Sequence, residues 1–386
     1  MEIFMRHSNK YRIAILYYMW PHYRKALMKN LDCSEQFDFV FYGSGNSFQG
    51  IKHVDVHSVK RFEVFPFVHF AGKMWQSAGI KVAMSRKYDA LIYLGDPNVI
   101  STWIGSALAR LRGIPVIFWG HGWIRPEGRI KSALRKIFYS LSDHFLVYSD
   151  RAKLLGREAG MNINRISIVY NSLDLAAADN IIKRIENGTL HNKHPNMLFS
   201  DKNRPLLICS ARLTQLCRFD ILLEAAALMS TRGRKVNILL IGDGPQRQFL
   251  QEMAEKLGLD VYFYGSCYDE AVIGQIIYWS DLTVSPGKIG LTAIHSLMYG
   301  TPVITHGDME WQMPEAEAIN PGCSGDFFVR NDAESLADAI SGWLDANPER
   351  DKIRSCCRSI IAEKWNPSVQ VKIIEDVLRR VLKIDG

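Results

Sequence analysis

A glycine-bearing loop at residues 285–290, with the sequence Ser-Pro-Gly-Lys-Ile-Gly, has the residue types and spacing best suited to chemistry in this chain. An apolar run precedes it and an amphipathic segment follows it, so residues 281–306 are predicted to form strand, loop, helix, turn and second strand. Glycines allow a ligand to approach the backbone closely, and a helix N-terminus offers free N–H groups and a positive dipole. The loop is therefore a candidate phosphate site.

Two upstream motifs strengthen this interpretation: Ala-Arg-Leu at residues 211–213 and Gly-Asp-Gly-Pro at residues 242–245. Each follows a predicted strand, as the loop does, and ligands of open α/β sheets bind at the carboxyl ends of the strands. Arg212 has the side chain best suited to gripping a phosphate. Gly242 and Gly244 have two explanations, because a tight turn from strand to helix favours glycine with or without a ligand.

The elements that must position these residues belong to a large globular protein. A chain of 386 residues, 47% hydrophobic and 23% charged, exceeds one ordinary core, so we expect two domains. The net charge of +7 suits an anionic ligand or membrane surface better than nucleic acid, since no basic-aromatic repeat or zinc-finger spacing occurs. Seven cysteines without a C-x-x-C pair suggest a reducing compartment.

Short apolar runs alternate with helical patterns along both halves of the chain, which predicts parallel sheets covered by helices. We expect an N-terminal domain over residues 1–190, a polar linker over 191–204 and a second domain over 205–365. The final segment, residues 366–386, has an apolar helical face and is expected to pack on the first domain. The expected fold is two doubly wound Rossmann-like domains.

The second half resembles the retaining glycosyltransferases of family 4, which have the GT-B fold with two such domains facing across a cleft. The resemblance covers most of residues 205–345, where several motifs agree in order and spacing. These motifs lie at residues 211–213, 220–225, 241–245, 263–265 and 290–304, with weaker matches at 13–17, 21–24 and 169–174.

The resemblance implies transfer of a sugar from a nucleoside-diphosphate sugar to a hydroxyl acceptor, with retention and without a metal or other cofactor. The acceptor is expected on the N-terminal domain, with His22 and Arg24 as candidate contacts, and His121 is expected to reach the donor sugar. The donor is expected on the C-terminal domain, where the implied contacts are Arg212, Arg218, Lys288, Gly242, Gly244, Gly265, Gly287, Gly290, Leu291 and His295.

The chain departs from the family pattern at three positions. Gly287 and His295 stand where the family has two glutamates that contact sugar and ribose, and Cys217 stands where it has a phosphate-binding lysine. Arg218 or Lys288 is expected to supply the missing positive charge. His295 is expected to take the ribose contact, although a histidine of the core is the alternative, and Glu315 and Glu317 are the nearest candidates for a displaced carboxylate.

The segment at residues 110–138 is rich in Lys and Arg, and its helical part has apolar residues at Ile130, Leu134 and Ile137. The plain interpretation is a solvated face with a buried apolar stripe; the alternative is a basic surface that docks on anionic lipid. The aromatic segment at residues 62–70 is either an acceptor loop or buried. With no apolar leader and no membrane-spanning run apparent, we expect a cytoplasmic protein, peripheral at most on the inner membrane face.

Two other functions remain open at this point. A nucleotide-sugar epimerase would require paired carboxylates in the cleft, and Gly287 and His295 do not provide them. A non-catalytic GT-B subunit that binds nucleotide or a partner protein is compatible with the missing glutamates. A nicotinamide oxidoreductase is disfavoured because Phe48 stands where the glycine motif that begins at Gly43 requires a third glycine. By analogy with the family, the expected acceptor is a lipid-linked or polysaccharide glycan.

Overall fold

A computed structural model describes residues 10–48, 51–125, 127–190, 194–346 and 349–384. The chain forms two compact units. Unit 1 contains residues 1–174 together with residues 367–386, and unit 2 contains residues 175–366. Residues 1–9, on which the expectation of no leader rests, and residues 191–193 of the expected linker lie outside the described ranges.

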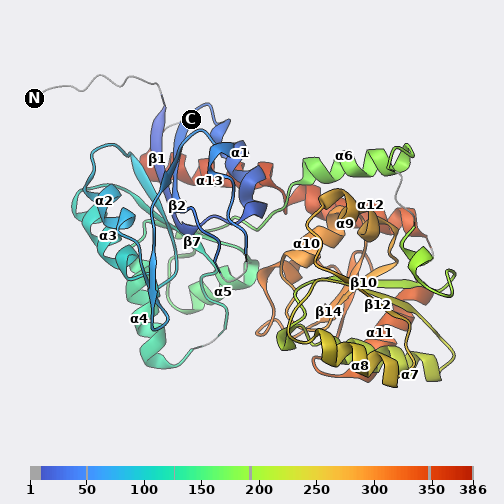
Figure 1. Cartoon of the computed structure of the whole chain (residues 1–386). Helices are drawn as coiled ribbons and strands as arrows, with labels where there is room; N and C mark the ends of the chain where they lie inside the picture. Colours follow the sequence, from blue (N-terminus) through green and yellow to red (C-terminus); the bar gives the residue numbers. More distant parts are fainter. Residues whose placement is uncertain (1–9, 49–50, 126, 191–193, 347–348, 385–386) are drawn as a thin grey trace, which may run out of the picture. The chain divides into compact units, whose positions relative to one another are not determined.

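Unit 1 is built on a parallel sheet of seven strands in the order β3-β2-β1-β6-β7-β8-β9 (Figure 1). The strands are β1 (Tyr11–Met19), β2 (Phe37–Ser44), β3 (Phe62–Val64), β6 (Ala90–Leu94), β7 (Val116–Gly120), β8 (His144–Val147) and β9 (Ile166–Ile168). A separate antiparallel hairpin pairs β4 (Val68–Phe70) with β5 (Lys73–Trp75). The central strands are nearly all buried, because helices cover both faces of the sheet, and this explains their continuous apolar sequences.

The helices of unit 1 are α1 (Lys25–Asp32), α2 (Ala78–Met84), α3 (Ile100–Leu111), α4 (Arg129–Ser140), α5 (Asp150–Glu158) and α13 (Pro367–Leu382). Helix α13 packs beside α1, and its residues Ile374, Val377 and Leu378 are fully buried in the same core as β1 and β2. Gln370 of α13 also donates a hydrogen bond of 2.9 Å to the backbone carbonyl of Tyr170. The last helix of the chain is thus part of the first unit.

Unit 2 has a parallel sheet of six strands in the order β12-β11-β10-β13-β14-β15 (Figure 1). The strands are β10 (Leu206–Ser210), β11 (Asn237–Ile241), β12 (Val261–Gly265), β13 (Leu282–Ser285), β14 (Val303–His306) and β15 (Gly325–Phe328). The helices are α6 (Leu175–Glu186), α7 (Phe219–Thr231), α8 (Arg247–Lys256), α9 (Glu270–Trp279), α10 (Leu291–Met298), α11 (Ala333–Ala346) and α12 (Arg350–Glu363). Two doubly wound Rossmann-like units, as expected from the sequence, are therefore confirmed.

The division between the units comes earlier in the chain than residue 190. Helix α6 packs against α9 and belongs to unit 2, so the chain passes from one unit to the other at Asp174 and Leu175. Residues 194–204 then cover one end of the sheet of unit 2, where Asn237 donates hydrogen bonds to Asn196 and to the carbonyl of Asp201. The polar segment interpreted as a linker is thus integrated into unit 2 through its described residues.

Two cysteines that are far apart in the sequence lie close together. Cys323, in the loop before β15, and Cys356, on helix α12, have Cα atoms 6.0 Å apart, whereas Cys33, Cys209, Cys217, Cys267 and Cys357 are free. The reducing compartment expected from the cysteine spacing stays a prediction.

Candidate functional site

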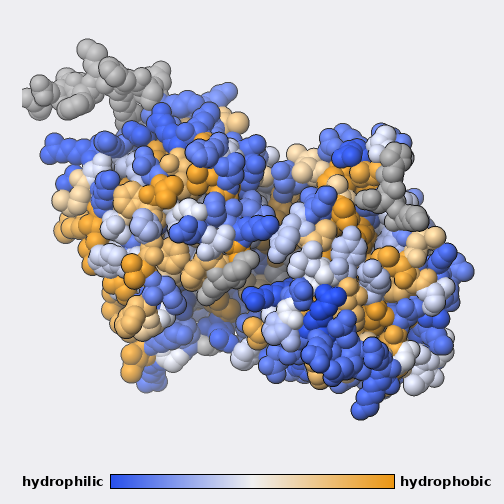
Figure 2. Space-filling model, viewed as in Figure 1, coloured by the Kyte–Doolittle hydropathy of each residue, from blue (hydrophilic) through white to orange (hydrophobic). Residues whose placement is uncertain are grey.

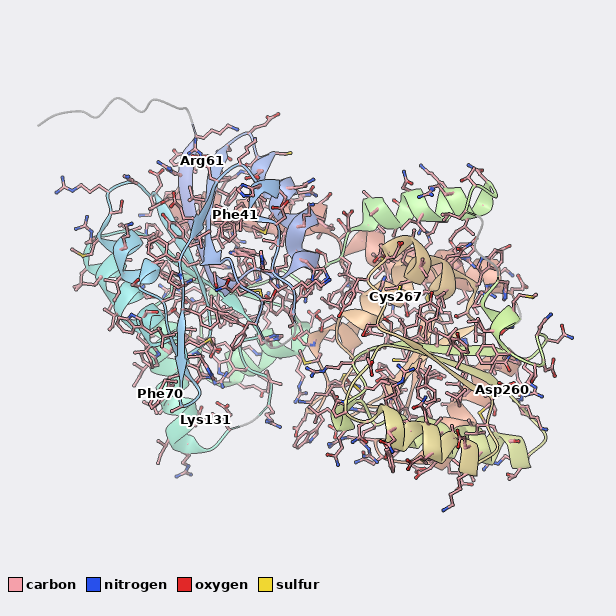
Figure 3. All side chains as sticks on the ribbon, viewed as in Figure 1. Phe41, Arg61, Phe70, Lys131, Asp260 and Cys267 are labelled. Carbon is pink, nitrogen blue, oxygen red and sulfur yellow. A yellow bond between two sulfur atoms is a disulfide. The ribbon has the colours of Figure 1, made fainter. Side chains whose placement is uncertain are left out.

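The sheet of unit 2 has its topological switch point between β10 and β13. From β10 the chain builds outward through β11 and β12, and from β13 it builds in the other direction through β14 and β15. Ligands of doubly wound sheets bind at such a point, beyond the carboxyl ends of the strands. Figure 3 marks the two ends of β12 with Asp260, before the strand, and Cys267, after it. The candidate loops lie at the edge marked by Cys267.

The loops that follow β10 and β11 pack directly on each other. A Cβ atom on Gly242 would lie 2.0 Å from the carbonyl oxygen of Ala211, and one on Gly244 would lie 2.4 Å from that of Leu213. The backbone N–H of Leu213 donates a hydrogen bond of 3.1 Å to the carbonyl of Asp243. Both glycines are thus required by packing alone, and this contact fixes the backbone on either side of Arg212.

Arg212 and Lys288 flank the switch point, the first after β10 and the second after β13. Both side chains are exposed, and neither forms an ion pair or side-chain hydrogen bond with any residue in the described ranges. Lys288 lies close enough to His306 that its charge, after burial and Arg330, helps lower the pKa of that histidine to about 4. Two uncompensated cations therefore stand at this edge of the sheet.

Arg218 is engaged elsewhere. Its Nε and Nη2 atoms donate to the carboxylate of Asp220 at 2.9–3.1 Å, and Nη1 donates to Asn331. It also adopts a left-handed backbone conformation, with φ of 49°, where it precedes α7. Of the two residues proposed to replace the family lysine, Lys288 is the one whose charge is free.

Gly287 lies against the segment after Arg212. Its N–H donates a hydrogen bond of 3.0 Å to the carbonyl of Cys217, and a Cβ atom there would lie 2.0 Å from the carbonyl oxygen of Leu216. Gln312 holds the loop from the other side, accepting from the N–H of Ile289 at 2.9 Å and donating to Thr305 at 2.8 Å. Sequence reasoning missed Gln312, because nothing in its local pattern marks it.

Helix α10 begins after Gly290, so Leu291 is its first residue and the first N–H groups of the helix have no partner within it. The hydroxyl of Thr292 donates to the carbonyl of Ser210 at 3.0 Å and thereby ties the helix start to the end of β10. Gly265, which has a φ of 84° that favours glycine, closes β12 and accepts a hydrogen bond of 2.8 Å from the N–H of Gly242. These contacts gather the predicted glycines at one edge.

His295 on α10 is paired with a carboxylate. Its Nε2 lies 2.9 Å from Oε1 of Glu270 on α9, and the hydroxyl of Tyr299 donates to the same oxygen at 2.8 Å. Glu270 is a second residue that sequence reasoning missed, since it lies on another helix, 25 residues before His295. Glu315, by contrast, is buried on the short 3-10 helix Pro314–Ala318, which also carries Glu317.

Unit 1 has its own switch point, between β1 and β6, and a cavity of about 360 Å³ lies there. Its walls come from the segments that follow β1, β6, β7 and β8, so it lies at the carboxyl edge of the sheet. Arg24 and His121 both line it, whereas His22 is exposed, is not among the lining residues and stacks edge-on against Tyr23. Of the three candidate residues of the first domain, the structure therefore brings Arg24 and His121 together and leaves His22 outside the cavity.

His121 opens on this cavity, and its ring packs edge-on against Tyr148 with the centroids 4.9 Å apart. The surrounding protein, and then the nearby charge of Arg24, lower the pKa of His121 to about 4 against the weaker opposing effect of Asp96. The imidazole is thus neutral at physiological pH. It can donate or accept a hydrogen bond without bringing a second positive charge beside Arg24.

A larger groove of about 1000 Å³ lies at the opposite edge of the sheet of unit 2. Its charged walls are largely occupied by ion pairs, among them Arg234 with Asp345 and Arg350 with Asp281. It is also remote from the loops that carry Arg212 and Lys288, because it is formed where the strands begin. Size alone therefore does not mark the functional site.

Two family models match the chain and together span most of it. The model for glycosyl transferases group 1 matches residues 191–358, and the model for glycosyltransferase family 4 matches residues 36–177. The chain belongs to glycosyltransferase family 4. The resemblance stated from the sequence is therefore confirmed, and the model for group 1 spans both cation-bearing loops of this family 4 chain.

Among curated relatives, the family 4 chain is 28% identical over 156 residues to the GDP-mannose-dependent alpha-(1-6)-phosphatidylinositol dimannoside mannosyltransferase of Mycobacterium tuberculosis, covering 40% of this chain and 38% of that enzyme. It is 26% identical over 263 residues to the putative glycosyltransferase EpsD of Bacillus subtilis, covering 62% of this chain and 65% of that protein. In both cases the match spans less than two thirds of the relative's own length.

Two solved structures resemble the family 4 chain over nearly its whole length. Alr3699/HepE of Anabaena in complex with UDP has a TM-score of 0.70 at 16% identity, covering 96% of this chain and all of that one. The lipopolysaccharide outer core galactosyltransferase WaaB, in its apo form, has a TM-score of 0.68 at 15% identity, covering 96% of this chain and 99% of that one. At these identities the likeness establishes the fold, which is GT-B.

Two further observations concern this family 4 chain. Within the described ranges, no group of three or more His, Cys, Asp or Glu side chains gathers in a way that could hold a metal ion. Over the same ranges, no helix combines the length and the apolar character needed to cross a membrane. Metal-independent catalysis stays a prediction.

Proposed function

We propose that this family 4 protein transfers a glycosyl residue from a nucleoside-diphosphate sugar to a hydroxyl group of a glycan acceptor, with retention and without a metal. The observation that carries the proposal is the pair of uncompensated cations, Arg212 and Lys288, at the switch point of unit 2 beside the start of α10. Such cations and free helix N–H groups form a site for a diphosphate.

The same groups suit the chemistry of the transfer. As the bond between the anomeric carbon and the phosphate oxygen breaks, negative charge grows on the diphosphate and positive charge on the sugar. Arg212, Lys288 and the N–H groups at the start of α10 are positioned to stabilise the diphosphate as a leaving group. Among the described residues we assign no nucleophile; a front-face displacement in which the leaving phosphate accepts the proton of the acceptor hydroxyl requires none.

We further propose that Glu270 and His295 bind the ribose of the donor. His295 occupies the position at which the family places a ribose-binding glutamate, and the pair at 2.9 Å restores a carboxylate at that place in the fold. A carboxylate oxygen accepts hydrogen bonds from vicinal hydroxyls, and the imidazole can fix its orientation. This assignment replaces Glu315 and Glu317 as the displaced carboxylate.

The names of the relatives support specific candidates for the donor and the acceptor. The Anabaena structures contain UDP or UDP-glucose, whereas the mycobacterial relative is named for GDP-mannose and a phosphatidylinositol mannoside acceptor. WaaB is named for the lipopolysaccharide outer core. We therefore propose UDP or GDP as the nucleotide, and a glycan carried on a lipid as the acceptor.

A membrane-bound acceptor is also supported by α4. The plain interpretation of the sequence buries the stripe formed by Ile130, Leu134 and Ile137, but these side chains are 81%, 55% and 57% exposed. Phe138 and Tyr139 of the same helix enter the core. Exposed Arg129 and Lys136 lie on the same helix. An exposed apolar face flanked by cations is typical of helices that lie in an anionic membrane surface.

The hairpin of β4 and β5 offers another exposed apolar side chain, because Phe70 at its tip is 79% exposed. Figure 3 shows Phe70 and Lys131 of α4 toward the same end of unit 1, and Figure 2 shows apolar and hydrophilic residues intermixed there. The aromatic segment at residues 62–70 is therefore not buried. We propose that this face of unit 1, the α4 face, rests on anionic lipid.

The donor site is tested by a thermal-shift panel of UDP, GDP, ADP and CDP with the wild type and the Arg212→Ala variant. A nucleotide at one hundred times its dissociation constant should stabilise the protein by about 2.7 kcal/mol, and the variant should lose most of that shift. Arg232→Ala is the matched control, since Arg232 pairs with Glu334 and Asp338 at the far edge of the sheet. A wild type that responds to none of the four would favour the non-catalytic subunit instead.

A further inference from the structure

The cavity of unit 1 contains a buried charge for which the fold itself gives no reason. The side chain of Arg24 is only 6% exposed, yet among the described residues no carboxylate pairs with it. Its Nη2 donates to the hydroxyl of Tyr148 at 2.6 Å, whereas Nη1 is buried and makes no hydrogen bond. Burying an unpaired cation costs several kcal/mol, which folding alone does not favour.

Aromatic rings hold this guanidinium in place. Its central carbon lies 4.9 Å from the ring centroid of Trp119, and 5.6 Å and 5.5 Å from those of Tyr17 and Tyr148. The hydroxyls of Tyr17 and Tyr148 are 3.2 Å apart, so Tyr148 accepts from Arg24 and can donate to Tyr17. Contacts with ring faces orient a cation but do not neutralise it. The positive charge is therefore fixed and uncompensated.

The other charged groups around the cavity leave Arg24 as the available cation. Arg135 donates to the carbonyl of Gly122 at 2.8 Å and to Glu127 at 2.8 Å, so its charge is balanced. Asp96 is the one carboxylate among the cavity's described lining residues, and its Oδ1 accepts from the N–H of Asn98 at 2.9 Å within its own loop. His121 is neutral, as described above.

The remaining walls suit a sugar. Tyr18, Tyr23, Tyr139 and Tyr148 line the cavity. A concave site of about 360 Å³ with aromatic walls and a few polar groups is typical of small-ligand sites and has room for a single sugar ring with one substituent. It opens at the switch point of unit 1, where such folds bind ligands.

We propose that this cavity binds a sugar unit of the acceptor that bears an anionic group, a phosphate or a carboxylate, and that Arg24 is the counter-charge for that group. The inference rests on the proposed function, because it names the chemical class of the acceptor. Nη2 is already committed to Tyr148 and Nη1 has no hydrogen-bond partner, so the anion meets an uncompensated guanidinium in the wall of the cavity. Arg24 thus determines acceptor specificity.

The test compares the binding of three probes to the full chain by calorimetry: methyl glucoside, methyl glucuronide and glucose 1-phosphate. We expect at least one of the two anionic probes to bind about tenfold more tightly than the neutral one, as a hydrogen bond to a charged group predicts. Arg24→Gln should abolish this preference, whereas Arg86→Gln, which removes an exposed charge of the same unit, should retain it. Tighter binding of methyl glucuronide would identify the anionic group as a carboxylate, and tighter binding of glucose 1-phosphate would identify it as a phosphate.

Two outcomes would overturn the proposal: equal binding of all three probes by the wild type, or a preference that survives Arg24→Gln. Wild-type binding alone decides the first, so the test stands even if the variant fails to fold. Nucleotide shifts are recorded on the same samples. Loss of those shifts would count against the donor site, whereas intact nucleotide shifts without an anion preference would count against the acceptor inference alone.

Discussion

The backbone N–H of Gly287 donates a hydrogen bond of 3.0 Å to the carbonyl oxygen of Cys217. These two residues stand at positions where the family pattern has a glutamate and a lysine, and in the structure they touch. Because a Cβ atom at position 287 would lie 2.0 Å from the carbonyl oxygen of Leu216, a glutamate does not fit while the 214–218 segment keeps this path. The two departures are therefore one structural change.

The first prediction concerns this contact. Gly287→Ala should lower the free energy of unfolding by about 2 kcal/mol or more, because the new methyl group must displace backbone atoms. Gly342→Ala is the control: no atom lies within 4 Å of its added Cβ, and in helix α11 it should stabilise by roughly 0.5–1 kcal/mol. Denaturant unfolding of both variants measures the difference. Similar values for the two would show that the loop after β13 moves freely.

The second prediction concerns Glu270 and His295. Glu270→Gln should weaken binding of the preferred nucleotide roughly tenfold, because a hydroxyl would lose its charged acceptor. The 2′,3′-dideoxy analogue lacks those hydroxyls, so wild type and variant should bind it equally well. Glu252→Gln on α8, whose carboxylate accepts a hydrogen bond of 2.9 Å from Gln248, serves as the control. An equal loss for both nucleotides would assign Glu270 a structural role through Tyr299.

The third prediction concerns the α4 face. Replacing Ile130 and Leu134 with Ser should reduce binding to vesicles that contain phosphatidylserine by about tenfold or more, because two apolar side chains no longer enter the lipid. Binding should also weaken as salt rises from about 0.1 to 0.5 M. Co-sedimentation with vesicles measures both effects.

The matched control for the α4 face is Leu154→Ser, which removes an exposed leucine from α5 of the same unit. Vesicle binding of this variant should equal that of the wild type. If the wild type does not bind anionic vesicles at low salt, the α4 face has another use and the membrane proposal fails.

The fourth prediction concerns acid sensitivity. Burial, with smaller contributions from Arg380, Lys153 and Arg165, lowers the pKa of His144 to about 4. The folded state then binds fewer protons than the unfolded state, so stability is full above about pH 6.5 and falls as the pH drops toward 4. His144 alone should lower the free energy of unfolding by about 1–2 kcal/mol at pH 5 relative to pH 7.5. Denaturant unfolding of His144→Gln should show a smaller difference in unfolding free energy between the two pH values. A difference equal to that of the wild type would contradict the prediction.

Much of the fold was predictable because parallel strands buried on both faces carry continuous apolar runs. Strands β6 and β10 are of this kind, with all but their last residue buried. The assignment of a helix to a domain was wrong where that assignment depends on tertiary contacts. Helix α6 was assigned to the first domain, since its sequence gives no sign that it packs on α9.

The candidate site was predictable to the extent that it follows strand ends. Arg212, Lys288 and the glycines lie where the pattern placed them, because a loop after a parallel strand must lie at the carboxyl edge. Glu270 and Gln312 escaped prediction because their roles arise from contacts between elements far apart in sequence. The sequence left the stripe of α4 open between a buried face and a lipid-docking surface, because periodicity identifies an apolar face but not what covers it.

The membership of α13 in unit 1 bears on how the protein emerges from the ribosome. Unit 2 is one continuous stretch, residues 175–366, and all of it is translated before α13. Unit 2 can therefore complete its core while the sheet of unit 1 still lacks Ile374, Val377 and Leu378 and leaves an apolar surface uncovered. A nascent chain stalled before residue 367 would leave that surface exposed, and transiently exposed apolar surface promotes aggregation.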